Sequence, residues 1–494
     1  MARVGLYASI IGAIGVAMVG HVSSVSAAEA TPTIERYVLE SPPGFDAVTR
    51  DGRRLLLDVG SGLAFKSKHG RTLEFYAVTD RGPNADGPGK VERPAGSGSK
   101  VFLVPGFQPT LGVVRVADGH ARLVSTRPLI NLDGTAVTGL PPDEKSAKQL
   151  AEVPLDADYR FDAGARRFDP QGLDLEAVTG PDKDGKLWMS DEYGPYILRV
   201  DARTGKILQK WAPGTTAKDL PVVFGERRTN RGLEGLTLDS SNDKLYGSLQ
   251  SPIDPQSADG KSLKARTKDG SSVEIKHQAK FLRWLELDPR TGARRTFAYP
   301  LDGSLYEKGR TGAAKVGDIV ALGSGKFLAI EQGSRRSDGK IQNWLMRVEL
   351  APGTTDITEF GHTLETSSIA GDSVEGADYN AIIPLKKERV LDLNAVGWTQ
   401  AKAEGLAIVD DRTIAIINDN DFGLASELRD TTGRPVAGSI EDCTVDGESG
   451  QLHACASADA VRGALIIADR NDAPVELWVI RFDQSLSTIK ELSR

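Results

Sequence analysis

Short apolar stretches separated by polar turns run along the whole chain. Residues 201–211 and 288–299 both read as a strand, a D-x-x-T-G turn and a second strand. "GSGKFLAIEQG" and "VDDRTIAIIND" each place a polar turn before a strand rich in Ile, Leu or Phe. Helical periodicity is scarce by comparison. Short strands at hairpin spacing, repeated along one chain, predict an all-β sandwich, barrel or propeller.

A self-similar unit narrows this choice. Each copy has an entry with Gly or an acidic residue, an apolar strand, a turn, and a second strand that ends in polar residues. The five copies are "GSGLAF…FYAVTDRGP", "GLDLEAVT…LWMSDEYGP", "NRGLEGLTL…LYGSLQSP", "KVGDIVAL…FLAIEQG" and "KAEGLAIV…IAIINDNDFG". We therefore expect a β-propeller with six blades, one of them degenerate or split around residues 381–394. Residues 34–40 are expected to return and close the last blade.

Acidic residues recur at fixed points of this unit. The first strand of a propeller blade lines the central channel, so acids repeated at blade entries should converge near the axis. The alternative is that each acid caps a strand end that faces water. The entries carry Glu176, Glu234, Asp318 and Glu404, and the exits carry Asp80, Asp191, Gln250, Glu331 and Asp419.

Composition supports a globular, turn-rich β protein. The 494 residues include 53 Gly and 25 Pro, and 39% of them are hydrophobic, enough to fill a core. Three polar insertions, at 131–170, 252–279 and 423–470, are expected to project as loops. The last contains Cys443 and Cys455, which in an oxidising compartment should form a local disulfide.

The N-terminus reads as a secretory signal peptide. "MARVGLYASIIGAIGVAMVGHVSSVSAAEA" has one early charge, an apolar run and small residues at "VSAA", so residues 1–27 are expected to be removed. A membrane anchor is the alternative, disfavoured by the short, glycine-rich run. The mature domain, residues 28–494, would then be periplasmic or secreted, with no membrane span after cleavage.

The charge of the mature chain argues against nucleic acid as a partner. Removing residues 1–27 leaves 60 basic against 68 acidic residues, a net charge of −8, and no basic tract. The expected partner is a small molecule, and the expected state is a monomer.

Four of the repeated motifs resemble a known family. "DLEAV…LWMSDEYGPYILRVD", "NRGLEGLTL…LYGSLQSP", "KVGDIVALGSGKFLAIEQG" and "KAEGLAIV…IAIINDNDFG" resemble the bacterial phytase-like proteins, described as the "esterase-like activity of phytase" family. The resemblance covers residues 46 to 483. It implies a β-propeller with repeated Asp and Glu residues and a phosphoester hydrolase activity. Calcium and phytate enter only by fold-level analogy to the calcium-dependent β-propeller phytases, because no segment matches their catalytic motifs residue by residue.

The acids predict a site for a hard divalent cation, with calcium as the expected ion, because such ions prefer oxygen ligands. The six dispersed histidines give zinc poor support. The candidate metal ligands are Asp80, Asp191, Glu234, Asp318, Glu331, Asp419 and Asp421. The candidate catalytic carboxylates are Glu176, Asp191, Glu192, Glu234 and Glu404.

Basic residues near the acids have two interpretations. Arg81, Arg231, Lys315 and Lys402 either form ion pairs that hold the acidic ring together or bind substrate phosphate. Under the second interpretation Arg81, Arg231 and Lys402 contact substrate. Tyr193 either positions the substrate or packs in the channel wall.

The expected function is an exported, metal-dependent hydrolase of phosphoesters or related esters at an acidic channel mouth. The chain has no G-x-S-x-G elbow, so a serine nucleophile has no candidate. One alternative is a lactonase-type propeller hydrolase with a single channel metal. Another is a non-catalytic propeller that binds a ligand or partner and whose acidic ring is structural.

Overall fold

The computed structural model describes residues 32–491 except 42–44, 46, 50–51, 56–57, 93–94, 144–151, 162–167, 217 and 469–472. The predicted signal peptide, residues 1–27, lies outside the described residues. Within the described residues no helix reaches the length and apolar character needed to cross a bilayer.

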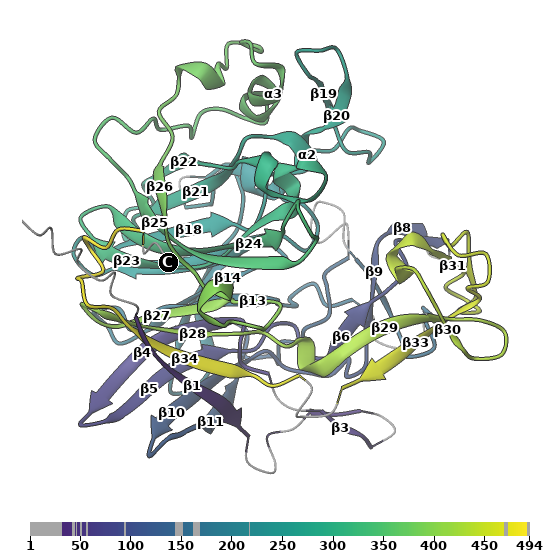
Figure 1. Cartoon of the computed structure of the whole chain (residues 1–494), viewed down its shortest axis with the longest axis horizontal. Helices are drawn as coiled ribbons and strands as arrows, with labels where there is room; N and C mark the ends of the chain where they lie inside the picture. Colours follow the sequence, from purple (N-terminus) through teal and green to yellow (C-terminus); the bar gives the residue numbers. More distant parts are fainter. Residues whose placement is uncertain are drawn as a thin grey trace, which may run out of the picture.

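Four-stranded antiparallel sheets make up the body of the molecule (Figure 1). One contains β13 (Leu175–Val178), β14 (Leu187–Asp191), β15 (Tyr196–Asp201) and β16 (Lys206–Trp211). The next contains β17 (Leu233–Asp239), β18 (Lys244–Leu249), β21 (Phe281–Leu287) and β22 (Arg294–Pro300). A third contains β23 (Ala314–Gly323), β24 (Lys326–Ser334), β25 (Ile341–Glu349) and β26 (Lys386–Asp392).

An eight-stranded sheet contributes two more such units. One half contains β4 (Gly62–His69), β5 (Thr72–Val78), β10 (Thr110–Ala117) and β11 (His120–Pro128). The other contains β27 (Gly405–Asp410), β28 (Thr413–Ile417), β34 (Glu476–Arg481) and β1 (Thr33–Glu40). The halves join where Leu39 and Glu40 pair in parallel with Ala121 and Arg122. β1 pairs antiparallel with β34, so the returning N-terminal strand is confirmed.

The first strands of these five units, β4, β13, β17, β23 and β27, contact one another in a closed cycle. This arrangement is that of a β-propeller. Glycines at the blade entries permit the close approach of the backbones. A Cβ at Gly62 would lie 2.7 Å from Cα of Ala177 on β13, and one at Gly235 would lie 2.7 Å from the carbonyl oxygen of Gly317 on β23.

The described residues contain five such units, whereas the sequence predicted six. Residues 386–392, which fall within the stretch expected to be a degenerate blade, form β26 and pair with β25. They are the outer strand of the unit that begins with β23. The sequence pattern of a single outer strand resembles that of a degenerate hairpin. Only the strand with which it pairs distinguishes the two.

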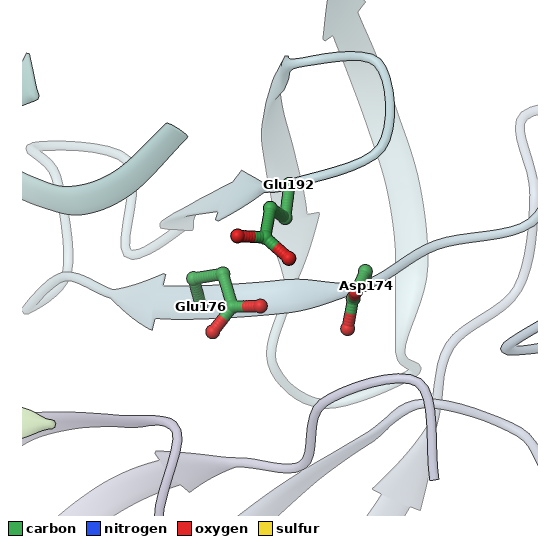
Figure 2. A group of neighbouring side chains, drawn as sticks. All are labelled: Asp174, Glu176 and Glu192. Carbon is green, nitrogen blue, oxygen red and sulfur yellow. The ribbon is translucent and has the colours of Figure 1, made fainter. Parts of the chain in front are cut away.

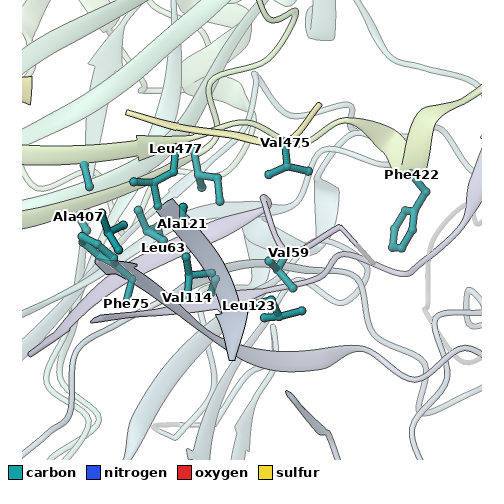
Figure 3. Close-up of a cluster of buried hydrophobic side chains, with 14 of the residues drawn as sticks. Val59, Leu63, Phe75, Val114, Ala121, Leu123, Ala407, Phe422, Val475 and Leu477 are labelled. Carbon is teal, nitrogen blue, oxygen red and sulfur yellow. The ribbon is translucent and has the colours of Figure 1, made fainter. Parts of the chain in front are cut away.

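Hydrophobic cores lie between neighbouring sheets. The largest combines Leu63, Phe75 and Val114 of the first unit with Ala407 and Leu477 of the last (Figure 3). β14, an inner strand of its sheet, is buried at all five positions.

Two of the insertions, together with residues 84–102, form a second structure beside the propeller, at the right in Figure 1. We call residues 84–102, 152–161 and 424–467 the side module. Its strands in residues 152–161 and 424–467 lie in stretches predicted as loops, because most of these strands have only two to three residues. The strands are β6 (Asn84–Asp86), β7 (Lys90–Glu92), β8 (Ala95–Ser97), β9 (Ser99–Phe102), β12 (Val153–Leu155), β29 (Leu424–Arg429), β30 (Pro435–Val436), β31 (Thr444–Val445), β32 (Leu452–His453) and β33 (Arg462–Ile467).

The side module has its own core, which includes Val101, Leu155, Ile440 and Val445. Cys443 belongs to this core and is bonded to Cys455, which confirms the predicted disulfide.

The remaining elements are short. Insertion 252–279 contains β19 (Lys264–Arg266), β20 (Ser272–Glu274) and α2 (Ile275–Gln278), and α3 (Thr363–Ala370) packs against β19. β2 (Ala47–Val48) pairs with β3 (Arg54–Leu55). The 3-10 helices are η1 (Val222–Glu226), η2 (Gly303–Leu305), η3 (Glu307–Gly309), η4 (Thr311–Ala313), η5 (Tyr379–Ala381), η6 (Asn394–Val396), η7 (Asp421–Gly423) and η8 (Ile440–Asp442).

Candidate functional site

A cavity of about 350 Å³ lies where the blade entries meet the side module. Every residue that lines it is polar or charged. From the propeller come Asp80, Arg81, Asp174, Glu176, Glu192, Arg228, Thr229, Asn230, Arg231, Glu234, Gln250, Lys315, Lys402, Glu404, Asp419 and Asp421, and from the side module Asn84, Asp86, Lys100, Glu152 and Glu441.

Two of the central carboxylates owe their orientation to the same local irregularity. In β13 the pairing register shifts between Leu175 and Ala177, and in β17 it shifts between Leu233 and Gly235. Glu176 and Glu234 are therefore each the extra residue of a β-bulge, a feature that re-aims a side chain. Both side chains line the cavity.

Antiparallel pairing brings acids from the two ends of one hairpin together. Leu175 at the start of β13 is opposite Asp191 at the end of β14, so Asp174 and Glu192, which flank these strands, become neighbours. Figure 2 shows Asp174, Glu176 and Glu192 gathered at this point. The stretch 174–192 is thus both a hairpin and the source of three cavity carboxylates.

The buried acidic groups can bind a metal ion. Oxygen atoms of Asp174, Glu176 and Glu192 lie within 4.8 Å of one another, and so do those of Glu176, Glu234 and Glu404. Glu176 belongs to both groups. In the described part of the chain, Oε1 of Glu192 and Oε2 of Glu234 are buried and accept no hydrogen bond. Unpartnered carboxylate oxygens are the donors that a hard cation takes, so these residues fit such an ion.

Burial and mutual repulsion disfavour the charged forms of these acids. Burial, and then the neighbouring Glu234 and Asp174, raise the pKa of Glu176 well above its ordinary range. Burial is also the main reason why the pKa of Glu192 rises to about 7 and that of Glu404 to about 8. A bound cation would offset this cost.

Three of the basic residues on the cavity wall are held by carboxylates. Nη1 of Arg81 lies 2.7 Å from Oε2 of Glu152 and 3.4 Å from Oδ2 of Asp174. Nζ of Lys402 lies 2.7 Å from Oδ2 of Asp419 and 2.8 Å from Oδ1 of Asp421. Lys100 pairs with Asp86 at 2.5 Å. For Arg81 and Lys402, the ion-pair interpretation describes the geometry.

The remaining basic residues of the lining differ from these three in their ion pairing. Over the residues that the structure describes, Arg228, Arg231 and Lys315 form no ion pair within 4.0 Å. Burial, and secondarily the charge of Arg228, lower the pKa of Arg231 to about 9. These side chains therefore present positive charge that no carboxylate holds in place.

Four residues that the sequence placed in the site lie outside the cavity lining. Oδ1 of Asp191 accepts a hydrogen bond from the Asp174 amide and Oδ2 one from the Gly194 amide, both at 2.8 Å, which fixes the turn after β14. Tyr193 donates its hydroxyl to the carbonyl oxygen of Gly139 and so packs in the wall.

Glu331 and Asp318 are the other two. Glu331 accepts hydrogen bonds from Tyr299 (2.6 Å) and Tyr306 and pairs with Lys387, so its side chain is satisfied within its own blade. Asp318 accepts from the amides of Ile319 (2.8 Å) and Leu406 (3.1 Å). Its oxygens are used by backbone donors.

The lining also contains residues outside the predicted site, among them Asp174, Glu152, Arg228 and Glu441. Asp174 lies two positions before Glu176, and Arg228 lies three before Arg231. Their closeness in sequence to predicted site residues could have indicated both. Glu152 and Glu441 come from insertions that carry no repeat, and nothing in the sequence connects them to the acids of the blades.

The blades and the acidic cavity define an all-β, propeller-like protein with a buried polar site. The chain belongs to the phytase-like family described as "Esterase-like activity of phytase", whose model matches residues 59–422.

An uncharacterized secreted protein of Arthroderma benhamiae is 30% identical over 210 residues, which are 36% of this chain and 40% of that protein. The chain therefore spans well under half of that relative's length.

Solved structures resemble the chain more remotely. The catalytic domain of a Coprinopsis cinerea GH62 α-L-arabinofuranosidase is 10% identical, with 92% of this chain and 99% of that one covered and a TM-score of 0.33. The periplasmic gluconolactonase PpgL of Pseudomonas aeruginosa is 10% identical, with 81% and 88% covered and a TM-score of 0.28. The GH43 protein BlXynB of Bacillus licheniformis is 12% identical, with 59% and 42% covered and a TM-score of 0.26. Similarity at this level says nothing about substrate.

Proposed function

We propose that this protein is an exported hydrolase of small, hydrophilic phosphoesters that works with a divalent cation, calcium by preference. The observation that supports this most directly is the lining of the cavity. Among the described residues, unpartnered carboxylate oxygens and basic side chains without carboxylate partners share one small space. This combination suits a ligand that is itself anionic and a cation that bridges it to the protein.

The wholly polar lining also restricts the substrate. Pockets for drug-sized ligands are lined mainly by apolar side chains and span about 300–1,000 Å³. This cavity is at the small end of that range, and among the described residues no aliphatic or aromatic side chain lines it. A substrate with a large apolar acyl or aromatic group would find no complementary surface, so a phosphoester of a polar alcohol fits better than an apolar carboxylic ester.

The cation would be held by Glu176 together with Asp174 and Glu192, or with Glu234 and Glu404. When bound, a divalent cation stabilises the negative charge that develops on phosphoryl oxygens. In the hydrolysis itself, a water oxygen forms a bond to phosphorus, the bond from phosphorus to the alcohol oxygen breaks, and the alcohol leaves with a proton. Arg231 and Lys315 would orient the phosphoryl group for that attack.

The side module would limit access of water to the cavity. Glu152 holds Arg81 from the side module, and Glu441 stands at the exposed edge. Restricting water strengthens the electrostatic interactions inside such a site. Export rests on the N-terminal signal-peptide pattern and agrees with the secreted fungal relative.

A direct assay tests this function. Purified protein comprising residues 28–494 is offered a phosphomonoester, a phosphodiester and a lactone, with calcium and with chelator. Glu234→Gln is compared with Glu448→Gln, which changes an exposed glutamate of the side module. We expect calcium-dependent phosphate release that E448Q retains. E234Q should lose more than the roughly 10- to 100-fold that removal of an outer-shell partner costs.

Absence of phosphate release with every cation tested would contradict the proposal. Turnover of the lactone alone would favour the single-metal lactonase, to which one cation at the shared Glu176 is suited. Tight calcium binding without turnover would favour a binding protein.

A further inference from the structure

We propose that Arg228, Arg231 and Lys315 form an anion subsite for the dianionic phosphoryl group, and that the carbonyl oxygen of Gly312 positions the two guanidinium groups. The identity of the anion rests on the proposed function. The subsite itself rests on the geometry of these four residues.

The basic residues of the cavity fall into two groups, those paired with a carboxylate and those that are not. Arg81, Lys402 and Lys100 each lie within 2.7 Å of a carboxylate oxygen, so their charge is compensated inside the protein. Arg228, Arg231 and Lys315 line the same cavity, yet no described carboxylate lies within ion-pair distance of them. Arg228, Arg231 and Lys315 are half-buried, and a bound anion would compensate their partly desolvated positive charge, so these three residues are the ones available to a ligand.

Arg228 and Arg231 are held by one shared acceptor. Nη1 of Arg228 donates to the carbonyl oxygen of Gly312 at 3.3 Å, and Nη1 of Arg231 donates to the same oxygen at 3.1 Å. A guanidinium group has five N–H donors, so this contact leaves most donors of each group available. Two guanidinium groups that share one acceptor are held close together despite their like charge. A phosphoryl group, with several acceptor oxygens and up to two negative charges, is suited to accept from both.

The backbone of Gly312 packs closely against α2. This residue lies in η4, and a Cβ at its position would come within 2.2 Å of the carbonyl oxygen of Lys276 and 3.0 Å of Cα of His277. Both neighbours belong to α2, within insertion 252–279 (Figure 1). A side chain at residue 312 would therefore push its backbone away from α2 and displace the carbonyl that aligns the arginines. Insertion 252–279 would therefore stabilise the anion subsite by fixing the position of the Gly312 carbonyl.

Lys315 connects the subsite to the acidic groups. Its side chain lines the same cavity as Arg231, Glu234 and Glu404. A phosphoryl group held by the arginines would therefore lie next to the carboxylates that hold the cation, as the proposed hydrolysis requires. Arg227, the neighbour of Arg228, takes no part, because its Nε donates to the carbonyl oxygen of Tyr193 at 2.9 Å.

Binding of inorganic phosphate tests the subsite without any need for turnover. Isothermal titration calorimetry is run on the full mature protein with calcium and with chelator. Loss of a charge-assisted hydrogen bond should weaken phosphate binding about 10- to 100-fold in Arg228→Ala and in Arg231→Ala. Arg290→Ala is the matched control, since that side chain is 86% exposed, and it should leave phosphate affinity unchanged.

Two further variants separate positioning from charge. Arg228→Lys keeps the charge but loses the planar fork, so it should bind phosphate more weakly than the unmodified protein and more tightly than R228A. Gly312→Ala retains all three cations but should weaken phosphate binding by displacing the carbonyl. Gly106→Ala is its control, because a Cβ there would meet no atom within 4 Å. Melting temperatures without phosphate show whether each variant is folded.

The outcomes distinguish the subsite from the proposed function. Phosphate binding that is absent in the unmodified protein, or unchanged in folded R228A and R231A, overturns the subsite even if phosphoesters are hydrolysed. Phosphate binding that both variants lose supports the subsite even if no phosphoester is hydrolysed. Unchanged affinity in folded G312A overturns the positioning role of Gly312.

Discussion

At the scale of single residues, the chemistry of the cavity depends on where a bulge falls. Glu176 and Glu234 have the same local sequence, Leu-Glu followed by a small residue, and both are the extra residue of a bulge at the start of a first strand. Asp318 occupies the corresponding stretch of β23, where the register shifts between Val316 and Ile319, yet it is held by backbone amides. The same position in the repeat thus serves two purposes.

Glu176 is the residue whose loss should affect cation binding most. It belongs to both groups of metal-binding carboxylates, so Glu176→Gln removes a ligand from each, whereas Glu192→Gln removes a ligand from one. We expect a larger loss of calcium affinity in E176Q than in E192Q, measured by calorimetric titration. Because E176Q also removes one of several repelling charges, the chelator-treated variant should melt no lower than the unmodified protein. Equal calcium affinity in E176Q and the unmodified protein would contradict this prediction.

At the scale of elements, closure of the ring depends on a strand from the N-terminus. β1 pairs with β34 over six positions, from Thr33 opposite Arg481 to Val38 opposite Glu476. It then continues into a parallel contact with β11 of the neighbouring unit. β1 therefore joins the last unit to the first. Arg36 adds a side-chain contact, since its guanidinium carbon lies 4.2 Å from the ring centroid of Trp478.

Deleting residues 33–40 should therefore destabilise the whole propeller. The deletion exposes the edge of β34 and removes the link between two units, and an exposed edge strand is prone to pair with other chains. We expect a lower melting temperature and concentration-dependent association, observed by calorimetry and light scattering. Deleting residues 492–494 serves as the control at the other end of the chain. A folded monomer with unchanged melting temperature after removal of β1 would show that the ring does not need this closure.

At the scale of the whole molecule, Asp318 joins the blades at the axis. Burial raises its pKa well above the ordinary range, and the amides of Leu406, Ile319, Leu236 and Leu63 oppose that rise. Those four amides belong to four of the five first strands, β27, β23, β17 and β4. Along β23, Lys315 lines the acidic cavity, whereas Ile319, Val320 and Ala321 line a second, largely apolar cavity of about 220 Å³. Asp318 lies between the two.

Removing the Asp318 carboxyl should cost stability and leave calcium binding intact. Asp318→Ala leaves the amides of Ile319 and Leu406 without their acceptor, at about 1–3 kcal/mol for each amide, so a loss of roughly 2–6 kcal/mol is expected. Asp318→Asn keeps one acceptor oxygen and should lose less. Denaturant unfolding measures the change, with Asp372→Ala at an exposed position as the control. If D318A loses calcium affinity without losing stability, Asp318 is a metal ligand after all.

Much of the architecture could be read from the chain alone. The hairpin repeat predicted the blades, the entry glycines and acids predicted the first strands, and the spacing of two cysteines predicted the disulfide. Each depends on neighbours along the sequence, over one hairpin or one loop, so local periodicity was sufficient. The same reasoning placed Glu176, Glu192, Glu234, Glu404, Asp80, Asp419 and Asp421 near one another, and all of them line the cavity.

Only the tertiary structure decided which basic residues are held by acids and which are not. Arg81 is paired because the side module brings Glu152 to it across 71 positions of sequence, whereas the guanidinium groups of Arg228 and Arg231 both donate to the carbonyl oxygen of Gly312. An ion pair requires its charged atoms to lie within about 4 Å of each other. For residues far apart in the sequence, their separation along the chain does not predict this distance. The number of blades and the separate role of Asp318 depend likewise on pairing between distant strands. The sequence alone therefore determined the repeated blades and their acids, and the packing of distant segments decided what each acid and each base is free to bind.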